Sequence, residues 1–308
     1  MTFLPTLKQL QYLTALHEHG HFGKAADACF VTQSTLSAGL RELETLLDAD
    51  LVERTRRVVR FTPLGERIVK KAYAVLREAD ELAAIAKAAG KPLSGELRLG
   101  VIPTIAPFLL PRALPRMRQA YPELKLYLRE ETSSSACDSL ARGQLDCVLL
   151  ALPFSCGDVS RFHLFDDPLY VAFHKGDVID PPAKFPASKI DEKHLLLLED
   201  GHCLKEHALS ACNRPELRSE AAVLGTSLHT LVQMVDNRLG QTILPKMAID
   251  AGIMNGTEVE ARLLAGNHSY REIALIWRNS SPRADEFKLL GEALMHAVQE
   301  DQEARAKH

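Results

Sequence analysis

The 308-residue chain lacks the features that would place it in a membrane or a secretory pathway. It has no run of about 18 uncharged apolar residues, which a transmembrane helix would need. Its first 20 residues carry His17, Glu18 and His19 where a secretory signal has an apolar stretch. No low-complexity segment argues for disorder. These absences predict a cytoplasmic protein with no membrane partner.

The sequence also lacks a net positive charge. It holds 37 Lys and Arg against 40 Asp and Glu, a formal net charge of −3, which excludes a uniformly basic nucleic-acid coat protein. The length, with 46% hydrophobic and 25% charged residues, predicts a soluble globular protein of two or three domains. No pattern in the chain calls for a metal or a cofactor, so we expect neither.

Cysteine is sparse. The six cysteines are Cys29, Cys137, Cys147, Cys156, Cys203 and Cys212. In a reducing cytosol these are expected to be mostly buried thiols, unless one pair is built to react. We interpret Cys29, Cys137 and Cys156 as packing residues.

The charge is unevenly distributed along the chain. Residues 1–91 hold 13 Lys and Arg against 11 Asp and Glu, net +2, and the remainder holds 24 against 29, net −5. Residues 54–71 contain seven basic residues and a single acidic residue, Glu66. Such a run is either a solvated surface or a phosphate-binding surface, and the segment before it favours the second.

Three helices are predicted at the start of the chain, with leucines at helical spacing in the first and third. The first ends near Gly20. The second, around 22–29, has small residues on its packing face, and Thr32 or Ser34 can cap the third. Two short helices joined by a tight turn indicate a helix-turn-helix. The side chains that the third helix leaves exposed for base contacts are Gln33, Ser34, Thr35, Ser37 and Arg41.

The next segment, residues 51–62, alternates apolar residues with arginines. It predicts a two-stranded wing that would place Arg54, Arg56 and Arg57 near DNA phosphates. The alternative is three ordinary packed helices followed by a solvated loop. That alternative does not explain why arginines are concentrated in this segment.

Residues 26–66 resemble the winged helix-turn-helix of LysR-type transcriptional regulators. The resemblance is carried by AA (25–26), TQSTLS (32–37), LE (43–44), L.ER (51–54) and FTPLGE (61–66). Ser34 departs from the family, which usually has proline or alanine at that place. The resemblance implies double-stranded operator DNA as a partner, with Thr32 also at the DNA-facing end of the third helix.

Residues 63–90 are alanine-rich, and their apolar residues recur at roughly heptad spacing, which predicts one long helix. A narrow apolar stripe needs a partner, either the same helix of a second subunit or the rest of its own chain. The resemblance favours the former and implies a homodimer or homotetramer. We therefore expect a winged helix-turn-helix domain over 1–62, a dimerisation helix over 63–91 and a regulatory domain over 92–308.

The regulatory segment alternates predicted strands with helices: strands at 96–102, 124–130 and 145–152, with helices at 109–122 and 135–143 between them. A second series follows, with strands at 169–174, 195–200, 241–245 and 271–277 and helices around 228–238 and 286–304. The resemblance implies an α/β domain of two subdomains, like a periplasmic binding protein. Subdomain I would span about 92–165 and 270–308, and subdomain II about 166–269, with an effector site between them.

One cysteine pair has informative spacing. Cys203 and Cys212 follow a predicted strand, and Cys203 lies near the start of a helix beside His202 and Lys205, which favours a lowered thiol pKa. Glu199, Asp200 and Glu206 act against that, so the balance stays open. If residues 203–212 were one helix, the two Cα atoms would lie about 13 Å apart on opposite faces. A disulfide needs them within about 7 Å, so bonding would require this segment to refold.

The same segment resembles the redox segment of the peroxide-sensing members of the LysR-type family. The resemblance implies that Cys203 is the peroxide-reactive cysteine and that Cys212 resolves it to a disulfide. It implies a peroxide pocket formed by Thr104, Ser133, Gly201, His202, Lys205 and Arg271, and a non-essential Cys147. Ser133 stands where a threonine is usual, and Lys205 where an arginine is common. Further implied partners are RNA polymerase, hydrogen peroxide and a glutaredoxin- or thioredoxin-type reductant.

Three other interpretations fit parts of the sequence. A LysR-type regulator of a small organic ligand, with the cysteines idle, would share the DNA-binding half. A thiol peroxidase would have no need of the helix-turn-helix and its arginines, so we expect a protein that is not an enzyme. A solute-binding protein for transport fits poorly with the absence of a secretory signal.

Overall fold

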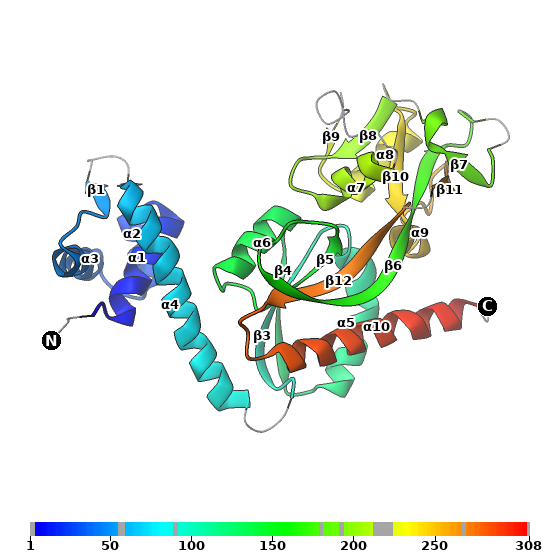
Figure 1. The fold of residues 1–308 in the computed structure, drawn as a ribbon. Coiled ribbons are helices and arrows are strands. Elements are labelled where there is room, and N and C mark those ends of the chain that lie inside the picture. The colour runs from blue at the N-terminus through cyan, green and yellow to red at the C-terminus, as the bar shows by residue number, and fades with distance from the viewer. Residues whose placement is uncertain are drawn as a thin grey trace. The chain divides into compact units, whose positions relative to one another are not determined.

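The computed structural model describes residues 4–54, 59–88, 92–178, 181–190, 194–211, 224–266 and 269–306. The chain divides into two compact units, Met1–Ala89 and Gly90–His308. Figure 1 shows the fold of each unit. None of the described helices is long and apolar enough to cross a membrane.

The first unit begins with three helices: α1 (Leu7–His19), α2 (Phe22–Ala28) and α3 (Gln33–Leu47). Thr6 and Gln9 form a reciprocal capping box at the start of α1, and Gly20 ends that helix in the left-handed conformation. Leu13, Leu16 and Leu36 are fully buried between the helices. The leucine pattern therefore places one core beneath all three helices.

The wing follows as two antiparallel strands, β1 (Val52–Arg54) and β2 (Val59–Phe61). It leads into α4 (Pro63–Ala88), the predicted long helix. The first half of α4 packs on its own unit, where Val69 and Ala72 are buried and the Tyr73 hydroxyl donates to the Thr14 carbonyl (3.4 Å). The first half of α4 therefore packs against its own chain, which was one of the two partners expected for this helix. Further along α4, Val75 and Leu82 are exposed.

The second unit is built on one ten-stranded sheet with the order β4-β3-β5-β12-β6-β10-β8-β9, in which β11 also pairs with β6 and β7 pairs with β11. We call its first part lobe I. Lobe I holds β3 (Gly95–Val101), α5 (Ala106–Ala120), β4 (Leu124–Glu130), α6 (Ser133–Ala141), β5 (Cys147–Leu152), the start of β6 (Val159–His174), β12 (Tyr270–Arg278) and α10 (Ala284–Ala306). The parallel β3–β4 and β3–β5 pairs follow from the predicted strand–helix alternation.

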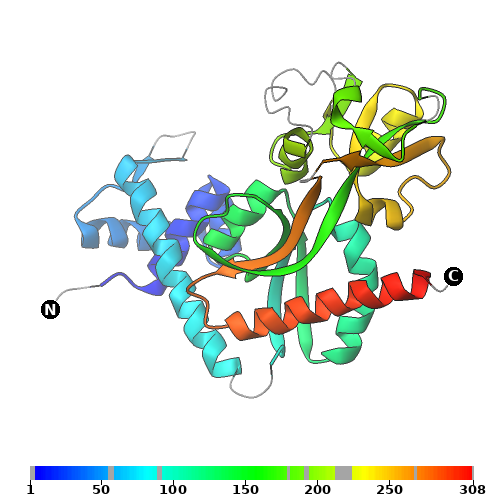
Figure 2. The same cartoon turned by 45° about the vertical axis from the view of Figure 1, so that its right-hand side comes forward.

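Lobe II holds the remaining elements. They are the end of β6, β7 (Lys184–Pro186), the short 3₁₀ helix η1 (Ala187–Lys189), β8 (Leu195–Leu198), α7 (Cys203–Ala211), β9 (Leu224–Gly225), α8 (Leu228–Asp236), β10 (Gln241–Pro245), α9 (Lys246–Asp250) and β11 (Val259–Ala265). Figures 1 and 2 show β6 and β12 running between the two lobes. The strand pairing of β6 marks the boundary between the two lobes. β6 pairs with β12 up to Pro168 and with β10 from Leu169 onward.

Candidate functional site

The polar end of α3 is exposed as predicted from its pattern. Thr32 is the N-cap, and its hydroxyl accepts the Thr35 backbone N–H (3.2 Å). Gln33, Ser34 and Thr35 are exposed beside it. The Ser34 and Thr35 hydroxyls each hydrogen-bond the Thr32 hydroxyl (2.8 Å). Exposed hydroxyl and amide groups at the start of a helix are of the kind that can contact base edges in a major groove.

Arg41 is exposed one turn after Ser37, and its guanidinium donates to the Ser37 hydroxyl (3.2 Å), toward the N-terminal end of α3. Ser37 itself is half-buried. Arg54 is the last residue of β1, whereas Arg56 and Arg57 lie outside the described residues. The wing is thus present, but the placement of its arginines stays a prediction.

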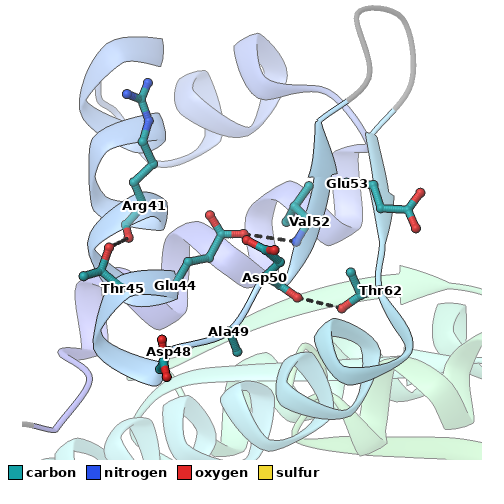
Figure 3. Close-up of a pocket in the computed structure, with 9 residues that line it drawn as sticks. All are labelled: Arg41, Glu44, Thr45, Asp48, Ala49, Asp50, Val52, Glu53 and Thr62. Carbon is teal, nitrogen blue, oxygen red and sulfur yellow. Dashed lines mark hydrogen bonds between the residues drawn. The ribbon is translucent and has the colours of Figure 1, made fainter.

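A hollow of about 880 Å³ lies between the C-terminal half of α3 and the wing (Figure 3). Its acidic lining consists of Glu44, Asp48, Asp50 and Glu53. Glu44 connects the two elements, because its carboxylate accepts the backbone N–H groups of Leu51 (3.0 Å) and Val52 (3.2 Å). These carboxylates would repel phosphates, whereas Arg41, which also lines the hollow, would attract them.

Cys203 is the first residue of α7 and is only 1% exposed. It lies where lobe II meets lobe I, because its backbone N–H donates to the Ser133 hydroxyl at the start of α6 (3.3 Å). Gly201 precedes it with φ +92°, a conformation that favours glycine. A side chain at Gly201 would also meet Ser134 Oγ at 3.1 Å and Thr132 Oγ1 at 3.5 Å. Hydroxyl groups at and before the start of α6 therefore lie beside Gly201 and the Cys203 backbone.

Burial raises the pKa of the Cys203 thiol, and this outweighs the Ser133 hydrogen bond, the Arg271 charge and a bond with the Ala151 backbone, all of which lower it. The neighbours expected to lower the thiol pKa contribute little. Burial lowers the pKa of His202 and favours its neutral imidazole. Lys205 Nζ pairs with the Asp200 carboxylate at 2.7 Å. The sequence left this balance open, and burial decides it toward a raised pKa, because Cys203 is enclosed rather than open to solvent.

Arg271 is a fully buried cation whose charge acts on Cys203, with 0% exposure at the start of β12. Its guanidinium pairs with Asp167 (Nη2 to Oδ2, 2.9 Å) and donates to Thr104 Oγ1 (2.7 Å) and to the Thr104 carbonyl (2.9 Å). Asp167 is buried as well and accepts the Met247 backbone N–H (2.9 Å). The ion pair therefore fixes Thr104 of lobe I against the strands that link the lobes.

Two residues at this site were not predicted from the sequence. Asp167 lies 104 positions from Arg271, and no local pattern marks it as the partner. His207, one turn after Cys203, has Nε2 2.9 Å from the Pro153 carbonyl, and burial lowers its pKa. A histidine on the same helical face as Cys203, at i and i+4, was the available signal.

Helix α7 fills the interval between the two cysteines of the predicted pair. It runs from Cys203 to Ala211, which places Ala211 about 12 Å along the helix axis from Cys203. Cys212 lies outside the described residues.

Cys137 and Cys156 do pack in and against the core, but they are not free thiols, because they form a disulfide with Cα atoms 5.2 Å apart. The bond was not predicted because these cysteines are 19 residues apart and approach only through the folding of α6 onto the loop after β5. Cys29, Cys147 and Cys203 are free thiols. Among the described residues no group of three His, Cys, Asp or Glu side chains is placed to hold a metal ion.

Both units match one protein family. Residues 7–66 match the bacterial regulatory helix-turn-helix protein, lysR family, and residues 90–299 match the LysR substrate binding domain. The chain therefore belongs to the LysR family of bacterial transcriptional regulators. The predicted fold class, a winged helix-turn-helix followed by an α/β regulatory domain of two subdomains, is confirmed.

Two curated relatives are similar over nearly the whole chain. The HTH-type transcriptional regulator EstR of Acinetobacter baylyi is 41% identical over 290 residues, covering 94% of this chain and 96% of the relative. The DNA-binding transcriptional dual regulator OxyR of Escherichia coli K12 is 37% identical over 288 residues, covering 94% of each.

Solved structures of OxyR proteins are similar to this chain as well. A cysteine-to-aspartate variant of full-length OxyR from Pseudomonas aeruginosa matches with a TM-score of 0.76 at 34% identity, covering 95% of both chains. A cysteine-to-serine variant of Corynebacterium glutamicum OxyR with bound H₂O₂ matches with a TM-score of 0.65 at 31% identity, covering 97% of this chain and 94% of that one.

Proposed function

We propose that this chain is a hydrogen-peroxide-sensing transcriptional regulator that controls oxidative-stress genes through a reversible Cys203–Cys212 disulfide. The observation that supports it most is the position of Cys203, enclosed at the start of α7 between the lobes, beside the Ser133 hydroxyl and within the field of Arg271. In this proposal the protein is cytoplasmic, is not an enzyme, and acts as a homodimer or homotetramer on operator DNA.

The first chemical step needs a thiolate, and Arg271 supplies the charge that favours it. The Cys203 sulfur attacks one peroxide oxygen, the O–O bond breaks, and hydroxide leaves to take up a proton as water. The product is Cys203 sulfenic acid. Hydroxyl groups of Thr104 and Ser133, with the backbone at Gly201 and the side chains of His202 and Lys205, would form the pocket that holds peroxide.

The second step joins the two cysteines. The Cys212 thiol attacks the sulfenic sulfur, an S–S bond forms, and water leaves. Because α7 occupies the whole of Cys203–Ala211, the helix must unwind before the sulfurs can meet. The refolded segment would change how regulatory domains pair and thereby alter contacts with DNA and RNA polymerase. A glutaredoxin- or thioredoxin-type dithiol would reverse the bond.

A titration of the purified full-length protein with hydrogen peroxide tests the proposal. Thiol trapping and mass mapping should find a Cys203–Cys212 bridge at low peroxide, and Cys203→Ser should abolish it together with the change in DNA binding. Cys147→Ala, which removes another buried thiol, serves as the matched control and should respond normally. A Cys203 that stays reduced at every peroxide level would end this proposal.

A second candidate deserves the same experiment because EstR, at 41% identity, is at least as similar to this chain as OxyR. In that case the chain would respond to a small organic ligand and its cysteines would be idle. Induction in cells that survives Cys203→Ser would favour this candidate.

A further inference from the structure

A second pair of cysteines lies beside the Cys203 site. Cys137 is in α6, and Cys156 is in the loop between β5 and β6, where the two form a disulfide. Cys137 is buried at 8% exposure, whereas Cys156 is half-buried with the exposed Ser155 and Gly157 on either side. A reductant or an oxidant therefore reaches this bond from the Cys156 sulfur.

The two elements that this bond joins both hold α7 in place. Ser133, one turn before Cys137 on the same buried face of α6, accepts the Cys203 backbone N–H (3.3 Å). Pro153, three residues before Cys156, has its carbonyl 2.9 Å from Nε2 of His207. One element thus contacts the first turn of α7 and the other contacts the next turn. The disulfide ties these two supports to each other.

We propose that Cys137 and Cys156 form a second reversible redox couple, and that its disulfide restrains the unwinding of α7 and slows the joining of Cys203 to Cys212. The restraint rests on the proposed peroxide chemistry at Cys203, whereas the redox activity of the couple does not. Opening the bond would leave α6 and the Pro153–Cys156 segment joined through noncovalent contacts alone. The sensor would then respond faster in a reduced cell than in one that is already oxidised.

The chemistry of the couple balances with a hydroperoxide as oxidant and a dithiol as reductant. The more accessible Cys156 thiol attacks the peroxide O–O bond, which gives a sulfenic acid and releases an alcohol, or water from hydrogen peroxide. The Cys137 thiol then displaces water as the S–S bond forms. In the reverse direction, a dithiol attacks the Cys156 sulfur, releases Cys137 as a thiol, and closes its own disulfide as it releases Cys156.

The couple itself is tested in a Cys203→Ser background, so that the result does not depend on Cys203. The full-length protein is equilibrated in a series of buffers with different ratios of reduced to oxidised dithiothreitol. Its free thiols are then alkylated, and its disulfides are identified by mass spectrometry. We expect the Cys137–Cys156 pair to pass reversibly between disulfide and dithiol in the folded protein, with Cys29 alkylated throughout as the internal control. Two thiols at every ratio, or a bond that no dithiol opens without unfolding, would overturn the proposal.

The restraint is tested on the wild-type cysteines. Protein with the Cys137–Cys156 bond closed and protein with it opened, both starting with reduced Cys203, are mixed with hydrogen peroxide and quenched in time. We expect Cys203–Cys212 to form several-fold faster when the bond is open. Cys137→Ser with Cys156→Ser should match the open form, and Cys29→Ser should match the closed one.

Equal rates in the open and closed forms would overturn the restraint. A protein that forms no Cys203–Cys212 bond in either form would remove the proposed peroxide function, and the restraint with it. The mapping in the Cys203→Ser background would still report whether Cys137 and Cys156 cycle, so the two failures are distinguishable.

Discussion

At the scale of single residues, Phe30 occupies a conformation that aromatic residues rarely adopt. It lies in the turn between α2 and α3 with φ +55° and 96% exposure, and its backbone N–H donates to the Asp27 carbonyl (3.1 Å). The left-handed region costs most residues roughly 1–2 kcal/mol, and asparagine visits it more readily. The side chain gains nothing from burial to offset this cost.

Replacing Phe30 with asparagine should therefore raise the free energy of unfolding of the first unit by about 1 kcal/mol. Hydrogen exchange at the amides of α1 and α3 measures it, because slower exchange reports greater stability. Phe30→Leu keeps both the strained backbone and an apolar side chain and should give no gain. An asparagine variant that exchanges as fast as the leucine variant would show that the backbone carries no strain.

Arg271 illustrates the cost of separating a buried ion pair. Arg271→Met should destabilise the regulatory unit by about 3–5 kcal/mol, because Asp167 would be left buried without its partner. The matched control is Arg161→Met, which removes the exposed Arg161–Glu272 pair (3.7 Å) between the same two strands, β6 and β12, and should cost no more than about 1 kcal/mol. Urea unfolding followed by the fluorescence of Trp277, the single tryptophan, measures both.

The Arg271→Met defect should also depend on pH. Burial raises the pKa of Asp167, and the guanidinium that opposes this would be gone in the variant. A carboxyl with a raised folded-state pKa stabilises the fold most at low pH, and that contribution is lost as the pH rises above the unfolded value near 4. The gap between variant and wild type should narrow at acidic pH. A constant gap would mean that Asp167 stays solvated.

The residues that sequence reasoning identified best are those with a local signature. Thr32 and the polar end of α3 follow from capping and helical periodicity, whereas the assignment of Cys203 rests on the resemblance of its segment and stays a prediction. Asp167 and the Cys137–Cys156 bond could not be predicted, because their partners are brought together only by the tertiary fold. The raised pKa of Cys203 depends on burial, which the sequence of one segment does not specify.

At the scale of elements, α7 is short and is associated with two buried histidines, His202 directly before its first residue and His207 at its middle. Burial lowers the pKa of both His202 and His207, so the unfolded chain binds more protons than the folded one below the ordinary histidine value of about 6.5. Stability contributed by these groups is present above that pH and is lost as the pH falls through it. Acidification should thus act in the same direction as events that unwind α7.

The urea concentration at the unfolding midpoint of the regulatory unit should therefore decrease as the pH is lowered from 7 to below about 6.5. The double variant His202→Asn, His207→Gln removes both protonation sites, so its midpoint should vary less over that interval. His163→Gln is the matched control, because His163 is an exposed histidine paired with Asp166, and it should retain the wild-type dependence. Parallel pH curves for wild type and the double variant would assign the acid sensitivity to other groups.

The regular elements were predicted where their periodicity is long. The strands at 124–130 and 241–245 appear as predicted, and the helices around 109–122 and 135–143 each begin two to three residues earlier, as α5 and α6. The elements that escaped prediction, β7, η1, β9, α9 and β11, lie in lobe II, and all but β11 have five residues or fewer. Such short segments are stabilised by their neighbours in the sheet rather than by their own pattern.

At the scale of the whole molecule, the exposed part of α4 remains the candidate surface for a second subunit. Leu82 is 71% exposed, and Val75 lies seven residues before it, so both fall on one stripe of the helix. Leu82→Asp should convert a dimer into a monomer at concentrations where the wild type is dimeric, because a desolvated carboxylate in a helix–helix seam is unfavourable.

Analytical ultracentrifugation measures this change. Lys70→Asp, which introduces the same charge at an exposed position of the same helix, is the control and should leave the dimer intact. A dimer that survives Leu82→Asp would place the subunit contact elsewhere.

The sharing of β6 and β12 between the lobes has a consequence for the order in which the protein is made. Lobe I begins at residue 95, yet its strand β12, which joins β5 to β6, is not synthesised until residues 270–278, after the described strands of lobe II. Lobe II can therefore close on the ribosome first, while the paired strands β4, β3 and β5 wait for the strand that joins them to β6. Arg271 arrives with β12, so the enclosure of Cys203 is among the last events in the making of each chain.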